Sequence, residues 1–402
     1  MRLLLLLLLV PALGHGQSSC GEMEVWDYSM AMCVPRAVPQ MPMRMLMVQG
    51  NGFASVINAE GPRGGRTFSA PNMLMADFGS TIGDHQYFNV DLMATAEKWT
   101  VPVRGTPELT QIGDTDQNDE PYVDHQHPHP SPVMGLTFSD TVSLGTGFFK
   151  FSFAPRGESG DGPVSFMHRP TGMVNPTAPL GHHTGQDVGH VTSTVLSALY
   201  GWGDNRLEVS VFNGTEPDPA KVTFPLGDLN SGAVRVTHSF GGGWYAMASS
   251  AYVKSPERLE PDIDSQERYS ASLYADKDLG GSRRFQNALI LGSLSESHRP
   301  DKHSLGEEFL LTFAANKLWG RVEFVERSSA DLEISIDDRP RWISAFTLGY
   351  TYRLAEWNET ELALGASLTK YILPTEYHAS YSGEPWSETL FLQMSGMKMW
   401  EL

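Results

Sequence analysis

The chain has 402 residues and a formal net charge of −18, from 29 basic and 47 acidic side chains. An acidic chain repels a phosphate backbone, so this balance argues against nucleic acid as a partner. Aromatic residues make up 10% of the sequence and glycines number 39, totals that fit a soluble enzyme as well as a membrane β-barrel. The pattern along the chain therefore has to decide the class.

The first residues are typical of a secretory signal. Arg2 is followed by an apolar run over residues 3–10, which is too short to cross a bilayer as a helix because that takes about 20 residues. We expect residues 1–16 to be a cleaved signal peptide and the mature chain to start near Gln17. Beyond this run the sequence has no apolar stretch long enough for a membrane helix.

Residues 17–44 form a methionine-rich segment that precedes the predicted strands. Its two cysteines, Cys20 and Cys33, are the only ones in the chain, and in an oxidising compartment they are expected to form one disulfide. Thioethers are soft ligands for Cu(I) and Ag(I), but methionine is also ordinary packing material, and both interpretations stay open for this segment.

From residue 45 onward, polarity alternates with a period of two. In one segment Phe88, Val90 and Leu92 point one way, whereas Asn89 and Asp91 point the other. The pattern predicts strands at about 45–60, 67–82, 85–101, 133–143, 147–155, 190–202, 205–213, 231–240, 244–254, 267–276, 284–296, 305–315, 318–328, 342–354, 359–371 and 387–398.

The connections between these strands alternate between two kinds. Hairpin-sized turns rich in Gly, Asn or Asp alternate with connections that are mostly long and polar, chief among them 102–132 and 156–189. Bacterial outer-membrane barrels have short periplasmic turns, long external loops and an even strand number. We therefore predict an all-β fold, a single antiparallel transmembrane β-barrel of about 16 strands over residues 45–402, with a soluble sandwich as the alternative.

The polar face of the predicted strands would line the barrel. Side chains on this face are expected to meet water or solutes in the lumen, since about sixteen strands leave an aqueous interior. The predicted lumen-lining residues are Asn89, Asp91, Arg235, Arg268, Arg321 and Glu323.

Two long loops hold most of the histidines, and the strand order places these loops next to one another on the outer rim. Imidazole with carboxylate suits Cu, Zn or Ni, and Met167 or Met173 could add a soft ligand for Cu(I). The alternative is that these side chains only staple the two loops together. The candidate metal ligands are Asp124, His125, His127, His129, His168, His182, His183, Asp187 and His190.

Nothing in the sequence indicates catalysis. Ser239 directly follows His238, which puts the two on opposite faces of a strand, and the chain has no GxSxG elbow. It also lacks a phosphate-binding glycine loop with its lysine. We expect no catalytic residues and no enzymatic activity.

Several blocks stand out along the sequence: QHPH at 126–129, FMHRPTGM at 166–173, the pair His182-His183, and the loop segments at 61–64, 212–218 and 254–262. Together these blocks resemble an uncharacterised family of predicted bacterial outer-membrane β-barrel proteins. The resemblance implies metal handling, because members are often associated with heavy-metal, especially copper, resistance. At Pro130 the chain departs from the family, whose pattern tends to have an acidic residue there.

Three functions follow from the sequence. The leading hypothesis is a porin-like channel of the bacterial outer membrane, connected with copper or another transition metal and partly closed by the 156–189 loop. The second is a metal-binding surface protein with a plugged lumen and external histidine loops. The third is an outer-membrane hydrolase. The expected partners are outer-membrane lipid, small solutes or metal ions, and a second copy of the chain in a homo-oligomer. The protein is expected to have either no cofactor or a bound Cu or Zn ion.

Overall fold

The computed structural model describes residues 24–27, 32–35, 43–116, 118–216, 226–256 and 261–402. The predicted signal peptide, Cys20 and the side chain of Cys33 lie outside the described residues. In the predicted methionine-rich segment, β1 (Glu24–Asp27) and β2 (Met32–Pro35) pair as a small antiparallel sheet.

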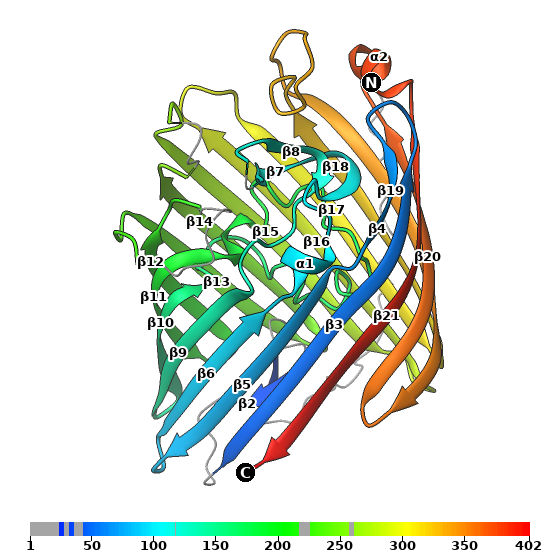
Figure 1. Ribbon diagram of the computed structural model, residues 1–402. Helices are drawn as coiled ribbons and strands as arrows, with labels where there is room; N and C mark the ends of the chain where they lie inside the picture. Colours follow the sequence, from blue (N-terminus) through cyan, green and yellow to red (C-terminus); the bar gives the residue numbers. More distant parts are fainter. Residues whose placement is uncertain (1–23, 28–31, 36–42, 117, 217–225, 257–260) are drawn as a thin grey trace.

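A closed antiparallel barrel forms the body of the molecule (Figure 1). Its alternating sequences pair antiparallel with their neighbours in the wall, with register shifts in five of the pairs, and β21 closes on β3. The strands are β3 (Arg44–Ala59), β4 (Gly65–Ser69), β5 (Asn72–Ile82), β6 (Gln86–Ala94), β9 (Val133–Leu144), β10 (Gly147–Gly157), β11 (Thr192–Trp202), β12 (Asn205–Asn213), β13 (Ser231–Gly241), β14 (Trp244–Lys254), β15 (Ser265–Asp278), β16 (Arg283–Glu296), β17 (Lys302–Phe313), β18 (Asn316–Arg327), β19 (Arg341–Trp357), β20 (Thr360–Ile372) and β21 (Trp386–Glu401).

Two of these segments, β4 and β5, share one place in the wall. β4 pairs with one half of β3 and β5 with the other, so the described part of the barrel has sixteen strand positions. The sequence predicted one strand over 67–82, but Pro71 interrupts it, because proline has no N–H for the ladder. The predicted fold class and the strand number are confirmed.

The two faces of the wall differ in polarity. The inner face is mostly polar, with buried side chains such as Asp77, Asn89 and Glu308. The outer face carries large apolar side chains in contact with the surroundings, which is the alternation that a barrel in lipid requires. Among these exposed side chains are Phe68, Leu74, Phe151, Val209, Leu291, Leu348 and Leu390.

The two rims of the barrel differ in the length of their connections. One, here called the turn rim, has hairpins such as Gly145-Thr146, where Leu144 pairs directly with Gly147 and Gly145 has a φ of 60°. The opposite edge, the loop rim, carries the long connections. Glu401 pairs with Met45, so both ends of the barrel sequence lie at the turn rim, as predicted.

Two of the long connections fold into the barrel rather than staying at the loop rim. The first contains α1 (Glu97–Thr100) and a hairpin of β7 (Thr106–Thr115) and β8 (Pro121–Gln126), and the second, residues 158–191, ends in the 3-10 helix η1 (Val188–His190) (Figure 1). We call these two segments the plug. The predicted strand 85–101 ends at Ala94, where the chain turns inward.

The predicted placement of the histidine loops on the outer rim is therefore wrong. These loops begin and end at the loop rim, but their polar side chains find partners on the inner face of the wall instead of in solvent. Arg169, for example, forms a buried ion pair with Glu308 of β17.

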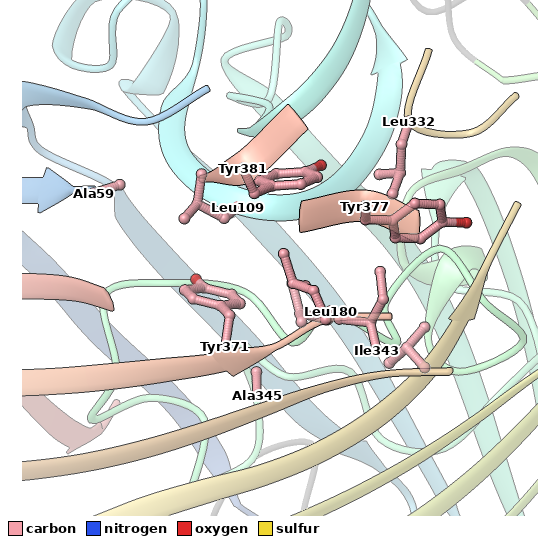
Figure 2. Close-up of a cluster of buried hydrophobic side chains, with 11 residues drawn as sticks. Ala59, Leu109, Leu180, Leu332, Ile343, Ala345, Tyr371, Tyr377 and Tyr381 are labelled. Carbon is pink, nitrogen blue, oxygen red and sulfur yellow. The ribbon is translucent and has the colours of Figure 1, made fainter. Parts of the chain in front are cut away.

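Apolar contacts hold the plug near the loop rim. Figure 2 shows Leu109 of β7 and Leu180 of the second plug segment among tyrosines of the wall and of the last long connection. That connection contains η2 (Thr375–Tyr377) and α2 (His378–Tyr381). Tyr377 and Tyr381 are almost fully buried in this cluster. No helix among the described residues has the length and apolar character needed to cross a membrane.

Candidate metal centre

Five histidines of the plug gather inside the barrel. His127 and His129 follow β8, whereas His182, His183 and His190 come from the second plug segment. Ring centroids within the group are 4.5 Å apart for His182 and His183 and 5.1 Å apart for His127 and His183. The structure thus brings together five of the nine candidate ligands, from segments more than fifty residues apart.

The Nδ1 atoms of His129, His182 and His190 each face a hydrogen-bond acceptor. Nδ1 of His182 lies 2.7 Å from Oδ1 of Asp187, and Nδ1 of His129 lies 2.9 Å from Oε2 of Glu97. Nδ1 of His190 lies 2.9 Å from the backbone oxygen of Asp187. An acceptor at Nδ1 holds the proton on that nitrogen and leaves the lone pair on Nε2, as in metal-bound histidines with a carboxylate or carbonyl partner.

The Nε2 atoms face one another in two pairs. The distance between the Nε2 atoms is 3.1 Å for His127 and His183, and 2.9 Å for His129 and His190. Two lone pairs at this distance repel unless a proton or a cation lies between them. Two nitrogens bound to one tetrahedral ion at about 2.0–2.1 Å would lie roughly 3.3 Å apart, so the spacing fits a shared metal ion.

Three of the rings form a compact set of donor atoms. One nitrogen each from His127, His182 and His183 lies within 4.8 Å of the others. A cavity of about 10 Å³ between these rings is bordered by Phe166, whose ring lies 5.2 Å from that of His182. That volume suffices for about one water or one ion.

The charge state of the rings also suits a metal. Burial and, after it, the neighbouring His129 and His182 together lower the pKa of His127 to about 3. Burial and the adjacent His182 likewise hold the pKa values of His183 and His190 well below the usual range. These three rings are neutral at pH 7, and the neutral imidazole is the form that binds a metal ion.

Asp187 connects the histidine cluster to the wall. Burial raises the pKa of its carboxyl, but His182 and then Arg169 outweigh that effect, so the net shift is downward and the group is ionised. Its Oδ2 accepts from the backbone N–H of Phe166 at 2.6 Å and from Arg169 at 3.3 Å. Arg169 in turn donates to both carboxylate oxygens of Glu308 at 3.0 Å.

The remaining predicted ligands lie outside the cluster. Asp124 accepts from Arg63 at 2.5 Å and from the Tyr381 hydroxyl at 2.7 Å, which makes it an anchor of the β7–β8 hairpin. His168 pairs with Glu158 at 3.0 Å, and Nδ1 of His125 lies 2.9 Å from the oxygen of Val123. His125 and His168 thus have partners within their own plug segments, and Asp124 binds residues outside the plug, so none of these contacts staples the two loops to one another.

Sequence reasoning missed two neighbours of the cluster. Glu97, which holds His129, was assigned to a strand, and Phe166 was assigned no role. No local pattern marks Glu97 as a partner of His129, because the contact depends on the inward turn of the chain after Ala94.

The six predicted lumen-lining residues all lie on the inner face, but most of them bind the wall or the plug rather than open water. Arg321 donates to the backbone oxygens of Thr177 and Ala178, and Glu323 accepts from the N–H of Leu180 at 2.6 Å. Arg268 pairs with plug residue Asp161. The other three bind along the wall: Arg235 pairs with Glu208, and Asn89 donates to Asp91.

Comparison with known proteins identifies the fold. No protein-family model and no curated protein matches the chain. An anion-selective porin from Comamonas acidovorans aligns with 89% of this chain and 99% of its own, at 11% identity and a TM-score of 0.51. The Salmonella typhi OmpF complex with daunomycin aligns with 93% of this chain and 100% of its own, at 10% identity and a TM-score of 0.54.

These likenesses show that the chain has the fold of bacterial outer-membrane porins. Fold and site together define a porin-type β-barrel whose lumen holds a plug with a buried histidine cluster. Because no family model matches, the resemblance to a copper-associated family stays a prediction.

Proposed function

We propose that this protein is a bacterial outer-membrane barrel that binds a transition-metal ion, Zn²⁺ or Cu²⁺, at the histidine cluster inside its lumen. One observation carries the proposal: the Nε2 atoms of His129 and His190 lie 2.9 Å apart while both Nδ1 atoms face acceptors. A cation between the rings turns this repulsive contact into a favourable one. Imidazole nitrogen suits both ions.

The membrane location is supported by the apolar outer face and by the porin fold. A barrel wall with large exposed apolar side chains needs lipid around it. Outer-membrane barrels have short turns on the periplasmic side and long loops on the outside. The turn rim would therefore face the periplasm and the loop rim the exterior. A metal ion would enter the cluster from outside, past the β7–β8 hairpin.

A metal titration tests the proposal. The refolded protein is titrated with Zn(II) and with Cu(II), alongside the variant His127→Ala/His129→Ala/His182→Ala. The variant His238→Ala/His298→Ala/His303→Ala is the matched control, because it removes the same number of histidines from outside the cluster. We expect the first variant to lose one tightly bound equivalent and the control to keep it. Equal stoichiometry in all three proteins would refute the proposal.

A porin-like channel is the second candidate, and the polar inner wall with the fold of an anion-selective porin favours it. The plug reaches the middle of the wall, where Arg169 pairs with Glu308 of β17 and Asn51 of β3 donates to the backbone oxygen of Met173, so we expect low conductance from the intact protein. Reconstitution in a planar bilayer tests this function. Complete absence of conductance at every voltage, also after removal of residues 160–188, would exclude a channel. The prediction that the protein is not a hydrolase or other enzyme stays open.

A further inference from the structure

Five methionines form a second cluster inside the barrel, next to the histidines. Met73 and Met75 come from β5, Met93 from β6, Met134 from β9 and Met167 from the plug. Met75 and Met93 are directly opposite one another in the β5–β6 ladder. Met73, Met93 and Met134 are buried, and the other two pack against them.

Shape alone does not require methionine at these positions. The inner face of the wall is mostly polar, and the other apolar clusters among the described residues are built largely from aliphatic and aromatic side chains. Leucine has nearly the volume of methionine and exchanges with it at low cost in a core. What methionine adds is a polarisable thioether sulfur, which is a soft metal ligand.

A cavity of about 50 Å³ lies beside the histidines, and one methionine of the cluster, Met134, is in its lining. Met134 borders the cavity together with His129 and His190. Ser131 also borders it, and its buried Oγ has no hydrogen-bond partner among the described residues. A thioether side chain, imidazole side chains and an unsatisfied hydroxyl therefore border one space large enough for a small ion with a water.

We propose that the methionine cluster is a binding site for a soft monovalent d¹⁰ cation, Cu(I) or Ag(I), held by thioether sulfurs beside the histidine centre. Arg156 and Glu216 both border the cavity, and their opposite charges offset one another. The neutral thioethers then leave the charge of the ion uncompensated, which favours a single charge over a double one. The thioether sulfurs are not among the donors of the proposed Zn²⁺ or Cu²⁺ centre, so the methionine site does not depend on that centre, although the histidines border the same cavity.

A silver titration tests the site with matched variants. The refolded barrel is titrated with Ag(I), alongside Met93→Leu/Met134→Leu and the control Met47→Leu/Met247→Leu, which changes two buried methionines outside the cluster. We expect the first variant to lose one bound Ag(I) while its Zn(II) binding and thermal unfolding match the wild type. The control should keep the Ag(I). If the first variant binds as much Ag(I) as the wild type, the site does not exist.

X-ray absorption of the Cu(I)-loaded wild type tests the methionine site without relying on the folding of a variant. We expect sulfur scatterers around copper in the wild type and in His127→Ala/His129→Ala/His182→Ala, because the thioethers remain in both proteins. Nitrogen and oxygen scatterers alone in the wild type would overturn the proposal. Loss of Zn(II) binding with retained copper–sulfur scattering would separate the two sites, so either one can fail without the other.

Discussion

At the scale of single residues, the carboxylates around the histidine cluster orient the rings that would bind the metal. Asp187 holds two of the five rings, His182 through its side chain and His190 through its backbone oxygen. Glu97 holds His129. Without these acceptors the imidazole rings could rotate and exchange tautomers, and their Nε2 lone pairs would no longer point to one place.

Asp187→Asn should therefore weaken metal binding without emptying the site. The amide keeps the shape of the carboxylate but removes its charge, and partners of this kind typically contribute 10–100-fold in metal affinity. We expect a loss of that order in competition titrations with a Zn(II) chelator. Glu158→Gln is the control, because Glu158 binds His168 outside the cluster. An unchanged affinity for Asp187→Asn would show that Asp187 does not orient a ligand.

A second residue makes docking of the plug depend on pH. Burial and, after it, the nearby Glu323 together raise the pKa of Glu108 in β7 to about 8. Glu108 is therefore protonated in the docked plug at pH 7, whereas the undocked, solvated group would ionise near pH 4.5. Protonated Glu108 contributes its full stabilisation to the docked plug below pH 4.5. This stabilisation falls by up to about 1.4 kcal/mol per pH unit as the pH rises toward 8.

Glu108→Gln should remove that dependence, because the amide stays neutral. Hydrogen exchange of residues 106–126, corrected for the intrinsic pH effect, measures the opening of the hairpin. Between pH 6 and pH 8 we expect the wild type to open progressively more and the variant to remain constant. The same slope in both proteins would assign the effect to another group.

At the scale of elements, buried ion pairs connect the plug to the wall. Arg169 of the plug and Arg321 of β18 both bind Glu308 of β17, and all three side chains are almost fully buried. Breaking a buried pair on one side leaves an uncompensated charge, which typically costs about 3–5 kcal/mol. The docking of the second plug segment is therefore sensitive to a single substitution.

Arg169→Met should release this segment. It leaves Glu308 and Asp187 each short of one partner, so we expect proteolysis within residues 158–191 and a higher conductance in planar bilayers than the wild type shows. Arg353→Met is the control, since Arg353 pairs with the exposed Glu356 at the turn rim. A plug that stays resistant to protease in Arg169→Met would mean that the apolar contacts around Leu180 suffice for docking.

The elements also show how far the sequence alone could lead. The strands followed from alternation such as Phe88 against Asn89, because a wall between lipid and a polar interior imposes a period of two. The inward fold of the plug did not follow, because a polar residue such as Arg169 suits solvent as well as a buried partner. Arg169 is buried because Glu308, 139 residues further along the chain, lies where it can pair with it. The sequence indicated the histidines as a group of candidate ligands. It could not show that Asp124 and His125 lie outside the cluster.

At the scale of the whole molecule, the barrel reverses the usual arrangement of a soluble protein. Its outer face is apolar, and its interior holds a polar network with many of the charged side chains. The chain as a whole has a net charge of −18. Stability of such a molecule depends on lipid around the middle of the wall and on water or headgroups at the rims.

This arrangement predicts that the cost of a charge on the outer face depends on its depth. Leu348 lies in the middle of β19 and Leu354 near its end at the turn rim, and both are exposed, by 58% and 50%. In a bilayer, Leu348→Arg should lower the free energy of unfolding by about 2–4 kcal/mol, whereas Leu354→Arg should lower it by about 0–1 kcal/mol. Reversible unfolding by guanidinium in lipid vesicles measures both. In a barrel surrounded by water the two substitutions would cost equally little, so equal small effects would contradict the membrane location itself.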